Sequence, residues 1–131
     1  MSIHVTWDDP EQTAIRLTFS PQWTWRELDN GFSRANAWIE AAGHPVDLIF
    51  DARETVMMPD SALTHIRDAL SRIHPHTRMI VVVVGPSAQI TRFGRTLVNF
   101  LQRFFWLHHP IIYTPTLEEA RAILQGRARI S

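Results

Sequence analysis

The stretch that decides the fold is Arg78-Met79-Ile80-Val81-Val82-Val83-Val84. Because every side chain from Met79 onward is apolar, this segment as an extended strand would be buried on both faces, which is typical of the centre of a largely parallel sheet. It is followed by Gly85-Pro86-Ser87 and then by a long amphipathic segment that ends before Pro110. The change from an apolar extended run to a helical pattern predicts one strand–helix unit.

The same unit recurs along the chain. Extended apolar runs over residues 15–19, 46–51 and 111–113 each precede an amphipathic helix. The first helix is expected to begin at the capping box of Thr24 and Glu27 and to end at Gly43. Its inward face should include Leu28, Phe32 and Ile39, and also Trp25 and Ala42 at its two ends. The second helix should begin at Asp60, and the last at a second capping box that starts with Thr116.

A strand over residues 3–7 precedes these units and should pair as a hairpin with residues 15–19 across Asp8-Asp9-Pro10. The predicted order is therefore ββαβαβαβα. We expect one α/β domain over residues 1–131, with a mostly parallel five-stranded sheet. Because parallel strands point the same way, the loops that begin near Phe19, Asp51, Gly85 and Thr114 should meet at one edge of the sheet, where open α/β folds usually bind ligands.

Composition excludes several kinds of chemistry. Cys 0 excludes disulfides and thiolate catalysis, and the 13 residues of the Lys+Arg count are all arginine, which excludes a Schiff-base or phosphate-loop lysine. A net charge of +0 argues against a nucleic-acid partner. No segment approaches the roughly 20 apolar residues of a membrane span. We therefore expect a cytoplasmic protein with no membrane span.

Short motifs resemble those of one known family. They are Leu48-Ile49-Phe50-Asp51, Met58-Pro59-Asp60-Ser61 and Tyr113-Thr114-Pro115-Thr116-Leu117-Glu118-Glu119-Ala120. Together with the element order, they resemble the STAS domain, and more closely its SpoIIAA-like stand-alone branch, the anti-sigma-factor antagonists. The resemblance implies a non-enzymatic regulatory module that binds a protein partner, such as a kinase or an anti-sigma-like regulator.

The resemblance also implies a phosphorylation site. In the phosphoregulated members, a serine just after the aspartate of this motif is modified and is followed by Gly-Leu. Here Asp60-Ser61 is followed by Ala62-Leu63, so the modified position aligns with Ser61 or with Ala62, which carries no hydroxyl. A phosphate on Ser61 in the first turn of a helix would be favoured by the helix dipole and repelled by Asp60. The simpler interpretation is that Asp60-Ser61 only starts the helix.

The candidate recognition surface is the loop after the third strand together with the second helix. Its residues are Asp51, Met57, Met58, Asp60, Ser61 and His65. The methionines would suit an adaptable contact. Asp51 at the end of a strand could instead be the acid of an uncharacterised hydrolase, or could simply accept hydrogen bonds from loop amides.

Other residues offer weaker alternatives. Ser87 and Arg92, at the start of the third helix, could hold an anion, although the glycine spacing of a nucleotide loop is missing. Trp106 widens the apolar band of that helix, which indicates a partner or homodimer surface, or a lipid or nucleotide site. The histidines of His74-Pro75-His76 and His108-His109 end helices, where a partly charged imidazole is favoured. We expect no metal and no cofactor.

Overall fold

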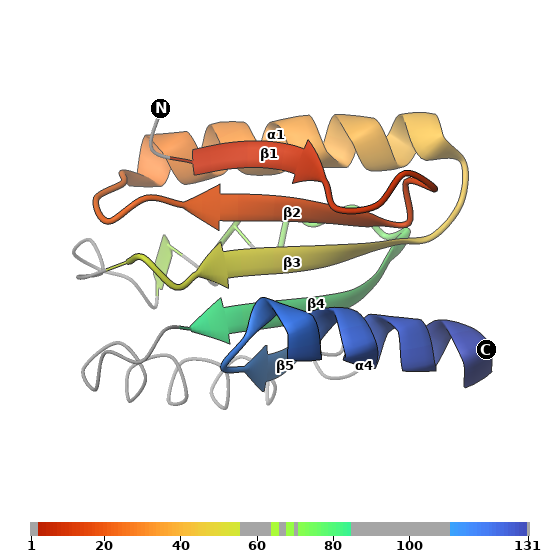
Figure 1. Cartoon of the computed structure of the whole chain (residues 1–131). Helices are drawn as coiled ribbons and strands as arrows, with labels where there is room; N and C mark the ends of the chain where they lie inside the picture. Colours follow the sequence, from red (N-terminus) through yellow and green to blue (C-terminus); the bar gives the residue numbers. More distant parts are fainter. Residues whose placement is uncertain (1–2, 56–63, 66–67, 70, 85–110, 131) are drawn as a thin grey trace.

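The structure is a computed structural model that describes residues 3–55, 64–65, 68–69, 71–84 and 111–130. Its elements are β1 (Ile3–Trp7), β2 (Ala14–Phe19), α1 (Trp25–Ala42), β3 (Val46–Ala52), β4 (Thr77–Val84), β5 (Ile111–Thr114) and α4 (Leu117–Ile130). The strands form one sheet in the order β1-β2-β3-β4-β5. β1 is antiparallel to β2, and each later strand is parallel to its neighbour (Figure 1). The α/β class is confirmed, and the sheet is mixed.

Two of the predicted helices fall wholly or mostly outside the described residues. The helix expected after Ser87 lies outside them altogether. Of the helix expected from Asp60, the structure describes Thr64, His65, Asp68 and Ala69, which are helical. The alternation of strands and helices is therefore established for β1 through β3 and for β5 with α4.

Helix α1 occupies the predicted residues because its two ends are specified locally. The Thr24 hydroxyl accepts a hydrogen bond from the Glu27 amide, and the Glu27 carboxylate accepts one from the Thr24 amide. At the other end Gly43 adopts φ 72°, a left-handed conformation that glycine takes without steric cost. The capping box and the glycine stop are both confirmed.

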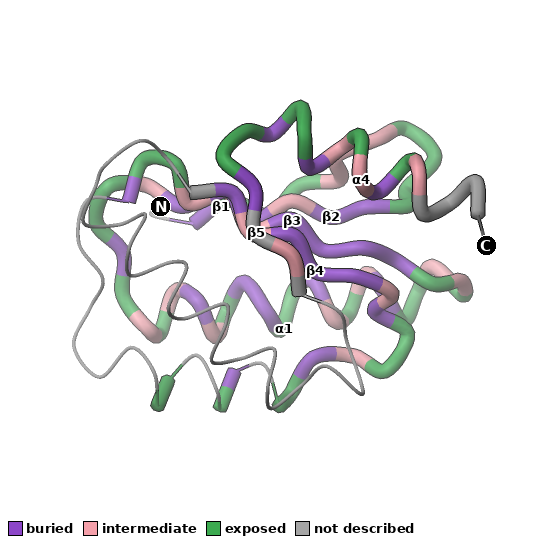
Figure 2. Tube along the Cα trace, turned by 90° about the horizontal axis from the view of Figure 1, so that it is seen from below, coloured by how far each residue is buried: buried purple, intermediate pink, exposed green. Residues whose placement is uncertain are grey.

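The sheet lies between two helical layers (Figure 2). Because side chains alternate along a strand, Ile15 and Leu17 face α1, while Ala14 lies in the cluster beneath α4. α1 buries Leu28, Phe32, Ala35 and Ile39 against the sheet, and Trp25 and Ala42 at its ends are only half-buried. α4 packs on β3, β4 and β5. Among the residues that the structure describes, none of the helices combines the length and the apolar character needed to cross a bilayer.

Candidate functional site

The described part of the site lies at the edge of the sheet where the parallel strands end. β2, β3, β4 and β5 all run in the same direction, so that their last residues meet at this edge, on the left of Figure 1. The first turn of α1 lies at the same edge, because α1 follows β2 through a short connection. The expectation that the strand ends gather at one edge is confirmed.

A row of aromatic side chains crosses this edge, and we call it the aromatic rim: Phe19, Trp23, Trp25 and His65. Phe19 and Trp23 meet edge to face at 5.0 Å, and Trp23 meets Trp25 in the same way at 5.0 Å. The imidazole of His65 stacks on Trp25 at 4.7 Å with an interplanar angle of 11°. Trp23 is buried, Trp25 is half-buried and His65 is exposed. The rim therefore connects the core to the surface.

The aromatic rim also holds the loop that follows β3. The indole N–H of Trp23 donates a hydrogen bond of 3.2 Å to the hydroxyl of Thr55, which is 2 % exposed. Thr55 is the last described residue before the segment 56–63, and His65 is just beyond that segment. Both flanks of the segment are thus attached to neighbouring tryptophans of one rim.

Asp51, near the end of β3, is buried and paired with Arg53. Its carboxylate is 6 % exposed and accepts hydrogen bonds of 2.7 Å from Nε and 2.7 Å from Nη2 of Arg53, as well as one of 3.3 Å from the Arg53 amide. Burial raises the pKa of Asp51, but the hydrogen bonds and the charge of Arg53 outweigh burial and hold that pKa below its usual value. Asp51 is therefore an ionised acceptor at neutral pH.

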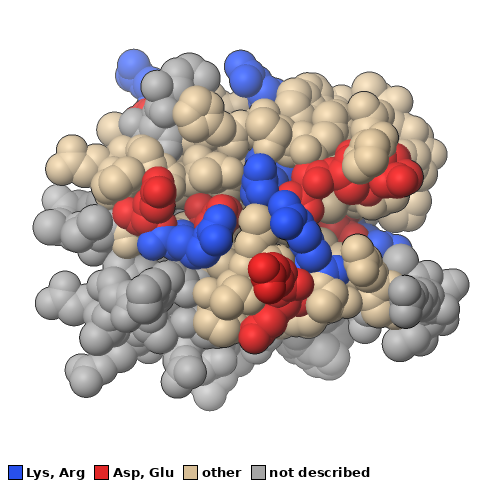
Figure 3. Space-filling model, viewed as in Figure 1, with Lys and Arg blue, Asp and Glu red and all other residues tan. Residues whose placement is uncertain are grey.

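A second group of charges lies on the face of the sheet beside α4. Asp8, 6 % exposed, accepts hydrogen bonds of 3.0 and 2.9 Å from Arg121 of α4 and lies 3.3 Å from Nη1 of Arg16. With Asp51 and Arg53 these residues form a charged face, and Figure 3 shows acidic and basic side chains gathered across it. α4 packs on β3, β4 and β5, and beyond the part of this face that α4 covers, β2 presents the polar side chains of Arg16 and Thr18.

The structure describes only some of the residues predicted for the site. Met57, Met58, Asp60, Ser61, Ser87, Arg92 and Trp106 lie outside the described residues. Asp51 and His65 are described and belong to different groups: Asp51 pairs with Arg53, and His65 stacks on Trp25 in the aromatic rim. Sequence reasoning placed Trp25 among the inward residues of α1 and did not single out Trp23 or Thr55. The available signal was the cluster of aromatic residues immediately before and within the capping box.

The histidines after the second helix take part in local contacts. His74 forms a hydrogen bond of 2.5 Å with Glu40 through Nε2, and its Nδ1 accepts one of 3.0 Å from the His76 amide. Because Nδ1 is an acceptor, the ring proton is on Nε2 and is donated to Glu40. Within the described residues, no group of three His, Cys, Asp or Glu side chains is arranged to hold a metal ion.

Comparison with known proteins gives no relative. No family model matches this sequence, and no curated protein or solved structure is similar enough to it to count as a match. The resemblance to STAS domains therefore stays an expectation from the sequence. What the site can do has to be inferred from its geometry and its charges.

Proposed function

We propose that this chain is a non-enzymatic interaction module of the STAS/SpoIIAA-like type. It recognises a protein partner through the aromatic rim and the segment 56–63, and phosphorylation of Ser61 switches that recognition. The observation that carries the proposal is that both flanks of the segment are held by the rim, at Thr55 and at His65. Ser61 is four residues before His65, so a phosphate there adds charge close to a stacked imidazole.

The exposed end of the rim supports a binding role. A tryptophan and a histidine that are stacked and incompletely buried offer a flat, rigid surface whose ordering costs little further entropy on binding. Aromatic residues of this kind are enriched among the residues that dominate binding energy at protein interfaces. The partner class that the family resemblance implies, a kinase or an anti-sigma-like regulator, belongs to this proposal.

The state of Asp51 supports a regulatory role over hydrolysis. A general base needs a lone pair free to accept a proton and a pKa near the working pH. Both carboxylate oxygens of Asp51 accept short hydrogen bonds from the Arg53 guanidinium, and the pKa of Asp51 lies below the usual value. A carboxylate in this state organises the end of β3, which positions the loop that follows.

The proposal is tested by partner capture with matched variants. Four baits are incubated with lysate of the source organism: wild-type protein, Ser61→Asp, His65→Ala and His4→Ala. His4→Ala is the control, because His4 is exposed on β1. The captured complexes are analysed by crosslinking mass spectrometry. We expect one partner that crosslinks near the rim, is retained by His4→Ala and is lost with both Ser61→Asp and His65→Ala. Equal capture by all four baits would refute the proposal, as would substrate turnover that Asp51→Asn abolishes.

Two further interpretations stay predictions. Trp106 as part of a homodimer surface on the third helix is tested by the mass of Trp106→Ala in light scattering, where an unchanged oligomeric state contradicts it. The weak anion site at Ser87 and Arg92 is tested by calorimetric titration with inorganic phosphate, where Arg92→Ala should abolish any binding heat.

A further inference from the structure

The β1 side of the sheet ends in a strand edge whose hydrogen-bonding groups point outward. β1 is the first strand in the sheet order, and its pairing with β2 is continuous from Ile3 to Trp7. The Asp8 amide donates a hydrogen bond of 2.8 Å to the Ala14 carbonyl, which continues this register. Because bonded and non-bonded pairs alternate along an antiparallel ladder, Ile3, Val5 and Trp7 direct their N–H and C=O groups away from β2. β1 contains no proline, charged residue or bulge that would keep another strand from pairing with it.

Helix α1 runs along this edge on one face of the sheet. Among the described strands, α1 contacts chiefly β1, and Figure 1 shows the two elements side by side at the top of the sheet, running in the same direction. Ile3 and Val5 belong to the core cluster on the α1 side. The helical layer therefore extends as far as the strand edge. A strand added beside β1 would pack on the flank of α1 and would be covered on one face.

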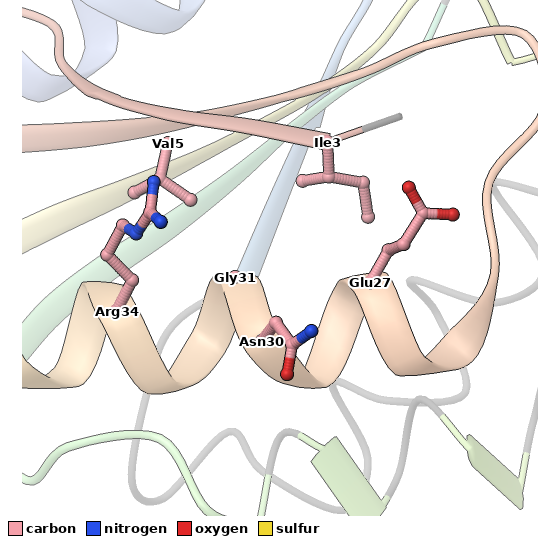
Figure 4. A pocket seen from close by; sticks show the side chains of 6 residues that line it. All are labelled: Ile3, Val5, Glu27, Asn30, Gly31 and Arg34. Carbon is pink, nitrogen blue, oxygen red and sulfur yellow. The ribbon is translucent and has the colours of Figure 1, made fainter. Parts of the chain in front are cut away.

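A groove lies between the β1 edge and this flank of α1 (Figure 4). It is lined by Ile3, Val5, Glu27, Asn30, Gly31 and Arg34. Gly31 keeps the middle of the groove open, because a Cβ there would be only 3.6 Å from both Ile3 and Val5. Side chains that lie directly opposite one another on paired strands point to the same face of the sheet. The residues of an added strand opposite Ile3, Val5 and Trp7 would therefore point into this groove and toward α1.

The position of α1 determines which kind of strand fits. A second copy of this chain, paired through its own β1, would bring its α1 to about 4.8 Å from the first, which is one strand spacing. Packed helices are about 8–10 Å apart, so two copies would clash. The occupant is therefore an extended segment that carries no helix on this face, as an unstructured linker or a chain terminus of another protein would provide.

The unpaired charge in the groove is positive. The carboxylate of Glu27 is engaged in the capping box, where it accepts hydrogen bonds from the amide and the hydroxyl of Thr24. Arg34 is exposed and forms no ion pair or hydrogen bond with any residue that the structure describes. In Figure 4 its guanidinium lies beside Val5. An acidic side chain opposite Val5 would therefore meet an arginine that has no carboxylate partner in the described part of the chain.

The next inward position is apolar. Trp7 of β1 stacks on Trp38 of α1 with the ring centroids 5.5 Å apart and an interplanar angle of 15°. Both tryptophans are only half-buried, so part of the pair is open to a further contact. The residue opposite Trp7 is two positions from the residue opposite Val5. An apolar side chain there would cover aromatic surface that is now in contact with water.

We infer that the β1 edge binds an extended segment of a protein partner, which adds to the sheet as a strand and carries an acidic side chain opposite Val5 and an apolar one opposite Trp7. Hydrogen bonds to the backbone of β1 contribute affinity, and the contacts with Arg34 and with the tryptophan pair contribute specificity. This surface uses different residues from the aromatic rim, so the inference does not depend on the proposed function.

The charge requirement is tested with a phage-displayed library of random heptapeptides, selected on wild-type protein. We expect enriched peptides that have an acidic and an apolar residue two positions apart. For a synthetic peptide from this selection, Arg34→Glu should raise Kd by about tenfold or more, because it opposes like charges. Replacing the peptide's acid with lysine should restore binding to Arg34→Glu. Arg26→Glu is the matched control, an exposed position of α1 outside the groove, and should leave Kd unchanged.

The backbone pairing is tested by hydrogen exchange and by Val5→Pro. The peptide should slow exchange at the amides of Ile3, Val5 and Trp7, whereas His4 and Thr6 are already bonded to β2. Val5→Pro removes an outward N–H and no bond to β2, so it should retain the circular dichroism of the wild type and lose the peptide. If Val5→Pro does not fold, the exchange pattern of the wild type decides.

Three results would overturn the inference. The first is a selection that enriches no peptide. The second is a Kd that responds equally to Arg34→Glu and Arg26→Glu. The third is a bound peptide that slows exchange elsewhere and leaves the outward amides of β1 unprotected.

Discussion

Arg53→Ala should destabilise the fold by far more than removal of an ordinary surface arginine, because it leaves the Asp51 carboxylate buried without its main donor. The substitution removes hydrogen bonds of 2.7 and 2.7 Å to a carboxylate that is 6 % exposed, whereas Arg53 itself is 45 % exposed. Breaking a fully buried pair costs about 3–5 kcal/mol, and an exposed pair is worth about 0–1 kcal/mol. With one buried partner and one half-exposed partner, we expect a loss of about 2 kcal/mol.

A matched control separates the effect of burial from the loss of an arginine. Arg72 is 54 % exposed and pairs with Asp29 and Asp68, which are 47 % and 71 % exposed. Because water can replace the guanidinium at both carboxylates, Arg72→Ala should cost less than about 0.5 kcal/mol. Both free energies of unfolding are measured by urea titration followed by tryptophan fluorescence.

The pH dependence tests the cause. The folded-state pKa of Asp51 is below its usual value of about 3.9, so the stabilisation is present above that pH and is lost as the pH falls through the folded pKa. The difference between wild type and Arg53→Ala should therefore be constant from about pH 7 to 5 and should shrink as the pH falls below about 4. A difference as small as that of Arg72→Ala, or one that does not shrink in acid, would refute the reasoning.

Three further tests of the fold use the same urea titration. Ile39→Ala, at a position that is 0 % exposed, should cost about 2–5 kcal/mol, and a cost below 1 kcal/mol would contradict the assigned core. A methyl group added at Gly43 or at Gly126 meets nothing within 4 Å, so the two alanine variants differ only in backbone conformation. Gly43→Ala should cost about 1 kcal/mol because φ is 72°, whereas Gly126→Ala within α4 should stabilise the fold by about 0.5–1 kcal/mol. Changes of the same sign in the free energy of unfolding would contradict this. Trp23→Phe should cost about 1–3 kcal/mol by leaving the buried Thr55 hydroxyl without its donor, and Thr55→Val in that background should recover part of the loss.

The parts of the fold that could be predicted are those specified by neighbours in sequence. Thr24, Glu27 and Gly43 bound α1 because caps act within a few residues, and their effect does not depend on the rest of the chain. The alternation of Ile15, Arg16 and Leu17 likewise predicts a strand with one apolar side. Asp51 was correctly placed at the end of β3 for the same reason.

The parts that could not be predicted depend on long-range geometry. Arg121 and Asp8 are separated by 113 residues, and their pairing requires both the strand order and the path of α4 across the sheet. Trp25 has the spacing of an inward helix residue, yet it is only half-buried, because the first turn of α1 extends to the end of the sheet, where His65 covers it. The spacing of apolar residues predicts which way a side chain points, but it does not predict which residues lie beyond the end of a strand.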